Sequence, residues 1–233
     1  MGRLRFRESV LKTIFTSSIT KQYIMKHLLL IIALCSSTFL MAQTKYEQGM
    51  TKAMELWEEN KLDEASNLFE RIATVEKDNW LPTYYVAQIA IIRNWRDFEN
   101  REEATMKATL DKAQEFINTM RTIAPDNPYA DHLQAQLYTV WVAHDGMKYG
   151  MKYAGTIGEL NQKMVNKEPD NPIFIAEKAQ WDMGSARYFG SSIAPYCAEL
   201  QRAITLFATF KPESKFHPKG NVKRALESAE ACN

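Results

Sequence analysis

The chain has 233 residues, of which 29 are Lys or Arg and 28 are Asp or Glu, so its formal net charge is +1. This balance gives no support for a nucleic-acid-binding protein, which normally carries a basic surplus. A hydrophobic content of 45% with only 9 Gly and 8 Pro argues against pervasive disorder, and three Cys are too few for a small disulfide scaffold.

Residues 28–42 form an apolar run that is too short for a typical membrane-spanning helix. Met25 and Lys26 precede the run and Ala42 ends it, which is the layout of a secretory signal peptide over residues 25–42. We therefore predict export, either to the periplasm or out of the cell. No membrane span is expected after cleavage.

Residues 1–24 then form a dispensable extension, with Met25 as the alternative start of translation. A mitochondrial transit peptide is the competing interpretation, because Arg3, Arg5 and Arg7 are basic and Glu8 is the one acid nearby. The apolar run favours the signal peptide and leaves residues 43–233 as the mature domain.

A pattern of Asp-Asn, seven residues, then Ala-Gln occurs three times, in residues 78–88, 126–136 and 170–180. Each copy predicts a corner between two helices. Proline before the corner stops one helix, while Asn127 and Asn171 can cap the next helix and Pro128 and Pro172 suit its first position.

Apolar residues recur every three or four positions between these corners, for example at Leu68, Ile72 and Val75. This spacing marks one buried face of a helix, and no comparable run alternates with the period of a β-strand. The sequence predicts an all-α fold.

The repeats resemble the tetratricopeptide repeat (TPR) family. The resemblance rests on residues 60–65 (NKLDEA) with Leu68 and Phe69, on Pro125 and Pro169, and on a small residue in each first helix. The small residues are Ala53, Ala87, Ala135 and Ala179. The resemblance implies a right-handed α-solenoid whose first helices line a concave, peptide-binding groove.

We expect about four TPR-like helix pairs and a C-terminal capping helix. The pairs lie near residues 45–77, 80–124, 128–168 and 172–211, and the cap lies near residues 220–232. A longer turn is expected at residues 95–100.

Three glutamines occupy equivalent places on successive first helices: Gln88, Gln136 and Gln180. In the groove that the resemblance implies, they form a ladder for a peptide backbone, and Tyr84 and His132 lie one turn earlier. The alternative is that each glutamine bonds to a neighbouring helix or turn.

Two further segments are candidate contact surfaces. Residues 147–154 repeat Met-Lys-Tyr at a spacing that stacks like side chains on a helix, either as a face for a partner or as ordinary packing. Residues 181–190 predict a turn in the last pair, with Arg187 and Tyr188 as anchors for a partner or as inward-packed side chains.

Cys197 and Cys232 are the cysteines left after signal cleavage. In an oxidising compartment we expect them to form a disulfide that ties the last pair to the cap, with two free thiols as the alternative.

No catalytic or metal-binding motif is recognisable, so we predict no enzyme activity, no cofactor and no metal. The leading hypothesis is an exported TPR-like scaffold that binds a peptide or protein partner in the cell envelope. The alternative is a small-molecule carrier with a pocket between repeats, and an unrecognised enzyme ranks third.

Overall fold

The computed structural model describes residues 45–96 and 102–232. The chain divides into two compact units, residues 1–49 and 50–233, and the candidate site lies in the second. Residues 45–49 of the first unit are helical. The predicted signal peptide and the extension before it lie outside the described residues.

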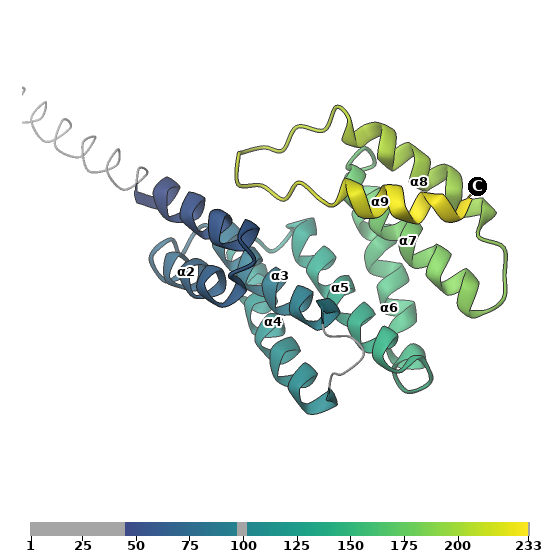
Figure 1. The fold of residues 1–233 in the computed structure, drawn as a ribbon, viewed down its shortest axis with the longest axis horizontal. Helices are drawn as coiled ribbons and strands as arrows, with labels where there is room; N and C mark the ends of the chain where they lie inside the picture. The colour runs from purple at the N-terminus through teal and green to yellow at the C-terminus, as the bar shows by residue number, and fades with distance from the viewer. Residues whose placement is uncertain (1–44, 97–101, 233) are drawn as a thin grey trace, which may run out of the picture. The chain divides into compact units, whose positions relative to one another are not determined.

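The second unit is built from helices, and its described residues contain no β-strand (Figure 1). The all-α prediction is therefore confirmed. Its helices are residues 50–58, α2 (Leu62–Val75), α3 (Trp80–Arg96), α4 (Glu103–Ile123), α5 (Pro128–His144), α6 (Gly146–Lys167), α7 (Pro172–Tyr188), α8 (Ala194–Phe207), α9 (Val222–Ala229) and the 3-10 helix η1 (Glu230–Cys232). Successive helices pack on one another, and α5 also lies against α3.

The repeated corners begin helices as the sequence predicts. The side-chain oxygen of Asn127 accepts a hydrogen bond from Tyr129 N at 2.9 Å, and that of Asn171 accepts one from Ile173 N at 3.0 Å. A proline occupies the start of both helices, where no backbone N–H is needed. Both predicted caps are confirmed.

Small residues allow the first helices to approach their neighbours closely. Ala87, Ala135 and Ala179 are completely buried, on α3, α5 and α7 respectively. Any larger side chain at these positions would have to displace the packed helices.

The predicted turn at residues 95–100 is wrong at its start. Trp95 and Arg96 still belong to α3, where Asn94 Nδ2 donates to Ala90 O at 2.8 Å inside the helix. Residues 97–100 lie outside the described residues.

The predicted turn at residues 181–190 is also wrong, because α7 continues through Tyr188. Met183 is buried in a cluster with Leu200 and Ala203 of α8, and this packing carries the helix past Gly184. The helix ends at Tyr188, and Gly190 just beyond it has a φ of +69°, which suits glycine, while Ser191 N donates to Ala186 O at 2.7 Å.

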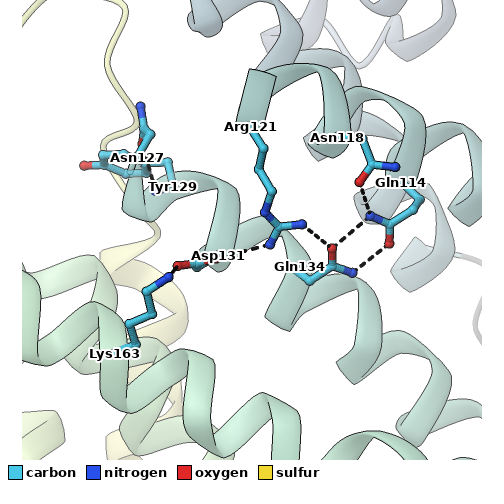
Figure 2. A network of polar contacts seen from close by, with 8 residues as sticks. All are labelled: Gln114, Asn118, Arg121, Asn127, Tyr129, Asp131, Gln134 and Lys163. Atoms are coloured by element: carbon cyan, nitrogen blue, oxygen red, sulfur yellow. Dashed lines mark hydrogen bonds and ion pairs between the residues drawn. The ribbon is translucent and has the colours of Figure 1, made fainter. Parts of the chain in front are cut away.

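Polar side chains hold α5 between α4 and α6 (Figure 2). Gln134 exchanges two hydrogen bonds with Gln114, at 2.7 and 2.9 Å, and accepts a third from Arg121 at 3.0 Å. Asp131 pairs with Arg121 at 3.2 Å and with Lys163 at 2.7 Å. These contacts fix α5, which contributes two residues to the candidate site.

The return segment, residues 208–221, runs from the end of α8 back to α3 and α5 before α9 begins (Figure 1). Tyr85 on α3 donates its hydroxyl hydrogen to Phe216 O at 2.7 Å. The His217 ring lies 5.2 Å from the Trp80 ring and 6.3 Å from the Tyr129 ring. Since α8 ends at Phe207, the segment begins before the predicted boundary at residue 211.

The chain ends against α8. Helix α9 lies against α7 and α8, and the Sγ atoms of Cys197 and Cys232 are 2.07 Å apart, as in a disulfide. No helix in the described ranges has the length and apolar character needed to cross a bilayer.

We predict that the mature protein carries this disulfide and that Cys197→Ser/Cys232→Ser lowers the free energy of unfolding. The bond closes a loop of 35 residues, which corresponds to about 3–4 kcal/mol by loop-closure entropy. Urea unfolding of the oxidised protein and the double variant measures this loss. Two alkylatable thiols in the untreated protein, in place of a mass deficit of about 2 Da, would contradict the bond.

Candidate functional site

A cavity of about 370 Å³ lies between α3, α5, α7 and the C-terminal part of the chain. Ligand pockets of small-molecule-binding proteins start at about this size. Its lining residues come from six places in the sequence: Trp57; Tyr84, Tyr85, Gln88, Ile91, Ile92 and Trp95; His132 and Gln136; Ile173, Ala176, Glu177 and Gln180; Phe207; and Pro218, Lys219, Gly220, Asn221 and Arg224.

A line of hydrogen bonds crosses one wall of the cavity from α3 to α7. The Tyr84 hydroxyl donates to Gln88 Oε1 at 2.9 Å, and Gln88 Nε2 donates to Gln136 Oε1 at 2.9 Å. Gln136 Nε2 in turn donates to Glu177 Oε2 at 3.3 Å. We call Tyr84, Gln88, Gln136 and Glu177, together with His132, the polar line.

The two ends of the polar line differ in charge. Burial, followed by the nearby Tyr85, Tyr129 and Glu177, raises the pKa of Tyr84, so its hydroxyl remains a donor. Burial alone would raise the pKa of the Glu177 carboxyl. Hydrogen bonding and attraction from His132, with Arg224 and Gln136, outweigh burial and lower that pKa to about 2.

His132 and Glu177 form a shielded pair. His132 Nε2 lies 3.5 Å from Glu177 Oε2, and the two side chains are 5% and 13% exposed. Gln136 Nε2 lies 3.1 Å from the same His132 nitrogen. The only carboxylate that lines the cavity within the described residues is thus already engaged by the protein.

Another part of the lining, the aromatic wall, is apolar and aromatic. Trp57 packs edge-on against Tyr85 with the ring centroids 5.5 Å apart, and Phe69 stacks on Tyr85 at 5.0 Å. Ile91 and Phe207 extend the wall. Aromatic side chains that pack on one another in this way hold an apolar ring surface in place for a ligand.

The return segment and α9 supply the remaining wall. Gln180 Nε2 on α7 donates to Ser228 Oγ at 3.1 Å and to Arg224 O at 3.3 Å, which fixes α9 against α7. Gly220 has a φ of +71°, and a Cβ there would come within 2.7 Å of Ile173 and 2.9 Å of Phe207. Only glycine fits this close approach.

The structure brings together five of the seven residues that the sequence put forward for partner binding. Gln88, Gln136, Gln180, Tyr84 and His132 all line the cavity. The three glutamines bond to other protein groups, as the alternative interpretation holds, and leave few free donors for a peptide backbone.

Arg187 and Tyr188 do not line the cavity. Both are exposed near the end of α7, and a Cβ on Gly146 would lie 3.3 Å from the Tyr188 ring. Inward packing of Tyr188 is therefore wrong, since its side chain is 63% exposed.

The Met-Lys-Tyr segment lies on α6 and faces two ways. Met147 and Met151 are 83% and 96% exposed. Tyr149 and Tyr153 instead pack on α5, with ring centroids 4.7 Å from Trp141 and 4.4 Å from Tyr138. The tyrosines thus serve packing and the methionines do not.

Sequence reasoning missed Trp57, Glu177, Lys219 and Arg224. Glu177 lies three residues before Gln180, so extending the glutamine face by one turn would have found it. Lys219 and Arg224 carry no such signal, because Lys219 lies on the irregular return segment and Arg224 on α9, whose place depends on the path of that segment.

A second hollow, of about 380 Å³, lies beside Trp80 and Tyr129. Its lining includes the acidic residues Asp126, Glu168 and Glu213. This hollow is therefore acidic, whereas the described lining of the first cavity includes the cations Lys219 and Arg224.

No protein-family model and no curated protein matches this sequence. The fold is similar to that of a solved structure, the HusA haemophore from Porphyromonas gingivalis, with a TM-score of 0.68 and 15% sequence identity. The superposition covers 81% of this chain and 92% of that chain. The two proteins share a fold.

The low pKa of Glu177 predicts how stability depends on pH. Because the pKa falls from its ordinary value of 4.5 to about 2 on folding, ionised Glu177 stabilises the folded state above about pH 4.5, and this contribution is lost as the pH falls toward 2. The full contribution is on the order of 3 kcal/mol.

The free energy of unfolding in urea, followed from about pH 7 to about pH 3, measures this effect. Glu177→Gln should flatten the loss of stability below pH 4.5, whereas the exposed Glu159→Gln should leave it unchanged. An equally steep loss in Glu177→Gln would show that the pair does not carry the effect.

Proposed function

We propose that this protein is a non-enzymatic carrier that holds a flat, largely apolar small molecule of the porphyrin class in the cavity between α3, α5 and α7. The observation that carries the proposal is the cavity itself. It combines a rigid aromatic wall with a polar line whose hydrogen bonds are already made within the protein. Such a surface suits an apolar ring better than a peptide backbone.

The shared fold supports the same cargo. The structural neighbour is named as a haemophore, a haem-binding carrier, and the superposition spans nearly all of that chain. Because the sequence identity between the two chains is low, the proposal of a haem-like cargo rests on the residues that line the cavity.

The lining residues fit a haem-like molecule in three respects. Trp57, Tyr85 and Phe207 offer faces for a flat ring, while Lys219 and Arg224 offer charge to acidic substituents. The residue types that can ligate haem iron are also present, as Tyr84, Tyr85 and His132.

The hydroxyls of both tyrosines and the Nε2 atom of His132 are engaged elsewhere, whereas His132 Nδ1 is buried with no hydrogen-bond partner among the described residues. Tyr84 donates to Gln88, Tyr85 donates to Phe216 O, and His132 Nε2 lies beside Gln136 and Glu177. We therefore assign recognition to the ring faces and the cations, without a bond from these residues to iron.

The scaffold hypothesis from the sequence has less support. Its glutamine ladder is bonded within the protein, and the return segment lies along the same cavity. The TPR-like character of the repeats and the export of the chain remain part of the proposal, supported by the repeated corners and by the cysteine pair at disulfide distance.

Titration with haemin, followed by the change in its Soret absorbance, tests the proposal. Binding should saturate at about one ligand per chain, and metal-free protoporphyrin should bind within about tenfold of haemin because no iron ligand is needed.

A cavity-filling variant gives the decisive comparison. Ile92→Trp adds bulk to the cavity lining and should weaken binding by about tenfold or more. Val75→Trp makes the same kind of change on a residue that is 78% exposed and does not line the cavity, so it should bind like the unmodified protein. Unsaturable binding, or equal affinity in Ile92→Trp, would reject the carrier.

A further inference from the structure

We propose that Lys219 and Arg224 bind the carboxylates of the cargo, so that the C-terminal part of the chain selects acidic ligands over neutral ones of the same shape. This inference rests on the proposed carrier function and assigns a selective element within the same site.

The charges that line the cavity favour an anion. The described lining residues include two permanent cations, Lys219 and Arg224, and one carboxylate, Glu177. That carboxylate is occupied by His132 and Gln136 within the shielded pair. The cavity therefore presents a net positive charge to an incoming ligand.

Among the described residues, neither cation forms an ion pair at salt-bridge distance. No ion pair or side-chain hydrogen bond joins Lys219 to any described residue, and Arg224 acts on Glu177 only by attraction at a distance. Both residues are exposed, so water solvates them until a ligand arrives. A carboxylate could then form charge-assisted hydrogen bonds with each of them.

The backbone that carries these cations is fixed on both sides. Phe216 is buried, and its carbonyl accepts from Tyr85, which holds the chain before Lys219. Gly220 presses against Ile173 and Phe207. On α9, Arg224 O accepts from Gln180 at 3.3 Å. The two side chains therefore start from defined positions at one wall, as a selective site requires.

Two parts of the cavity lining suit two different parts of the cargo. The aromatic rings of Trp57 and Tyr85 suit the apolar part of the cargo, whereas Lys219 and Arg224 suit its carboxylates. The second hollow has the opposite character, because it is lined by Asp126, Glu168 and Glu213. An acidic ligand is thus directed to the first cavity by charge as well as by shape.

The experiment compares haemin with haemin dimethyl ester, which keeps the ring and removes both negative charges. The unmodified protein should bind haemin at least about tenfold more tightly than the ester, with the preference shrinking at high salt. Lys219→Gln/Arg224→Gln should lose about tenfold in affinity for haemin and little for the ester.

Lys223→Gln is the matched control. Lys223 is the neighbour of Arg224 on α9, its side chain is 86% exposed, and it does not line the cavity. This variant should keep the full preference for haemin. Circular dichroism and urea unfolding establish that each variant is folded.

The outcomes separate the two claims. If the double variant keeps the preference for haemin, or the unmodified protein binds both probes equally, carboxylate selection by Lys219 and Arg224 is overturned and the carrier stands. If the unmodified protein binds neither probe, the carrier proposal fails and this inference fails with it.

Discussion

The hydrogen bonds of the polar line join three helices that are far apart in sequence. Gln88 on α3 bonds to Gln136 on α5, and Gln136 bonds to Glu177 on α7. Buried polar groups are costly unless they are paired, so each helix can approach the next only in the register that satisfies these side chains. The line therefore fixes the spacing of the helices that frame the cavity. It also satisfies the amide groups of Gln88 and Gln136 within the protein, which leaves few free donors on that wall for a peptide.

The return segment supplies part of the cavity lining that α3, α5 and α7 leave open. It leaves α8 at Phe207, makes contact with α3 through Phe216, and reaches α9 at Asn221, whose side chain caps that helix. The cysteine pair then holds the end of the chain on α8. Because the segment lies between two anchored ends, the backbone of Lys219 is held at the cavity, and Arg224 follows on α9. The buried amides thus set the shape of the site, and the return segment together with α9 supplies its positive charge.

The sequence predicted the helical class and the capped corners, since both depend on local rules of spacing and capping that Asn127 and Asn171 satisfy. The repeated motif also placed the glutamines at equivalent positions of three successive helices. It did not reveal that they bond to one another, because the distance between Gln88 and Gln136 depends on how helices pack. The turn expected near Gly184 was wrong because tertiary contacts of Met183 override the weak helix propensity of glycine. Lys219 lies on a long irregular connection, which has no periodicity from which to infer its path, and Arg224 lies on the predicted capping helix, whose position against α7 depends on that path.

The most direct test of the account is a crystal structure of residues 43–233 grown with haemin. The account predicts the ring in the cavity beside Trp57 and Tyr85, with its carboxylates within hydrogen-bonding distance of Lys219 and Arg224 and the polar line unbroken. Haemin bound elsewhere, for example on the exposed Met147 and Met151 of α6 with the cavity unchanged, would contradict it.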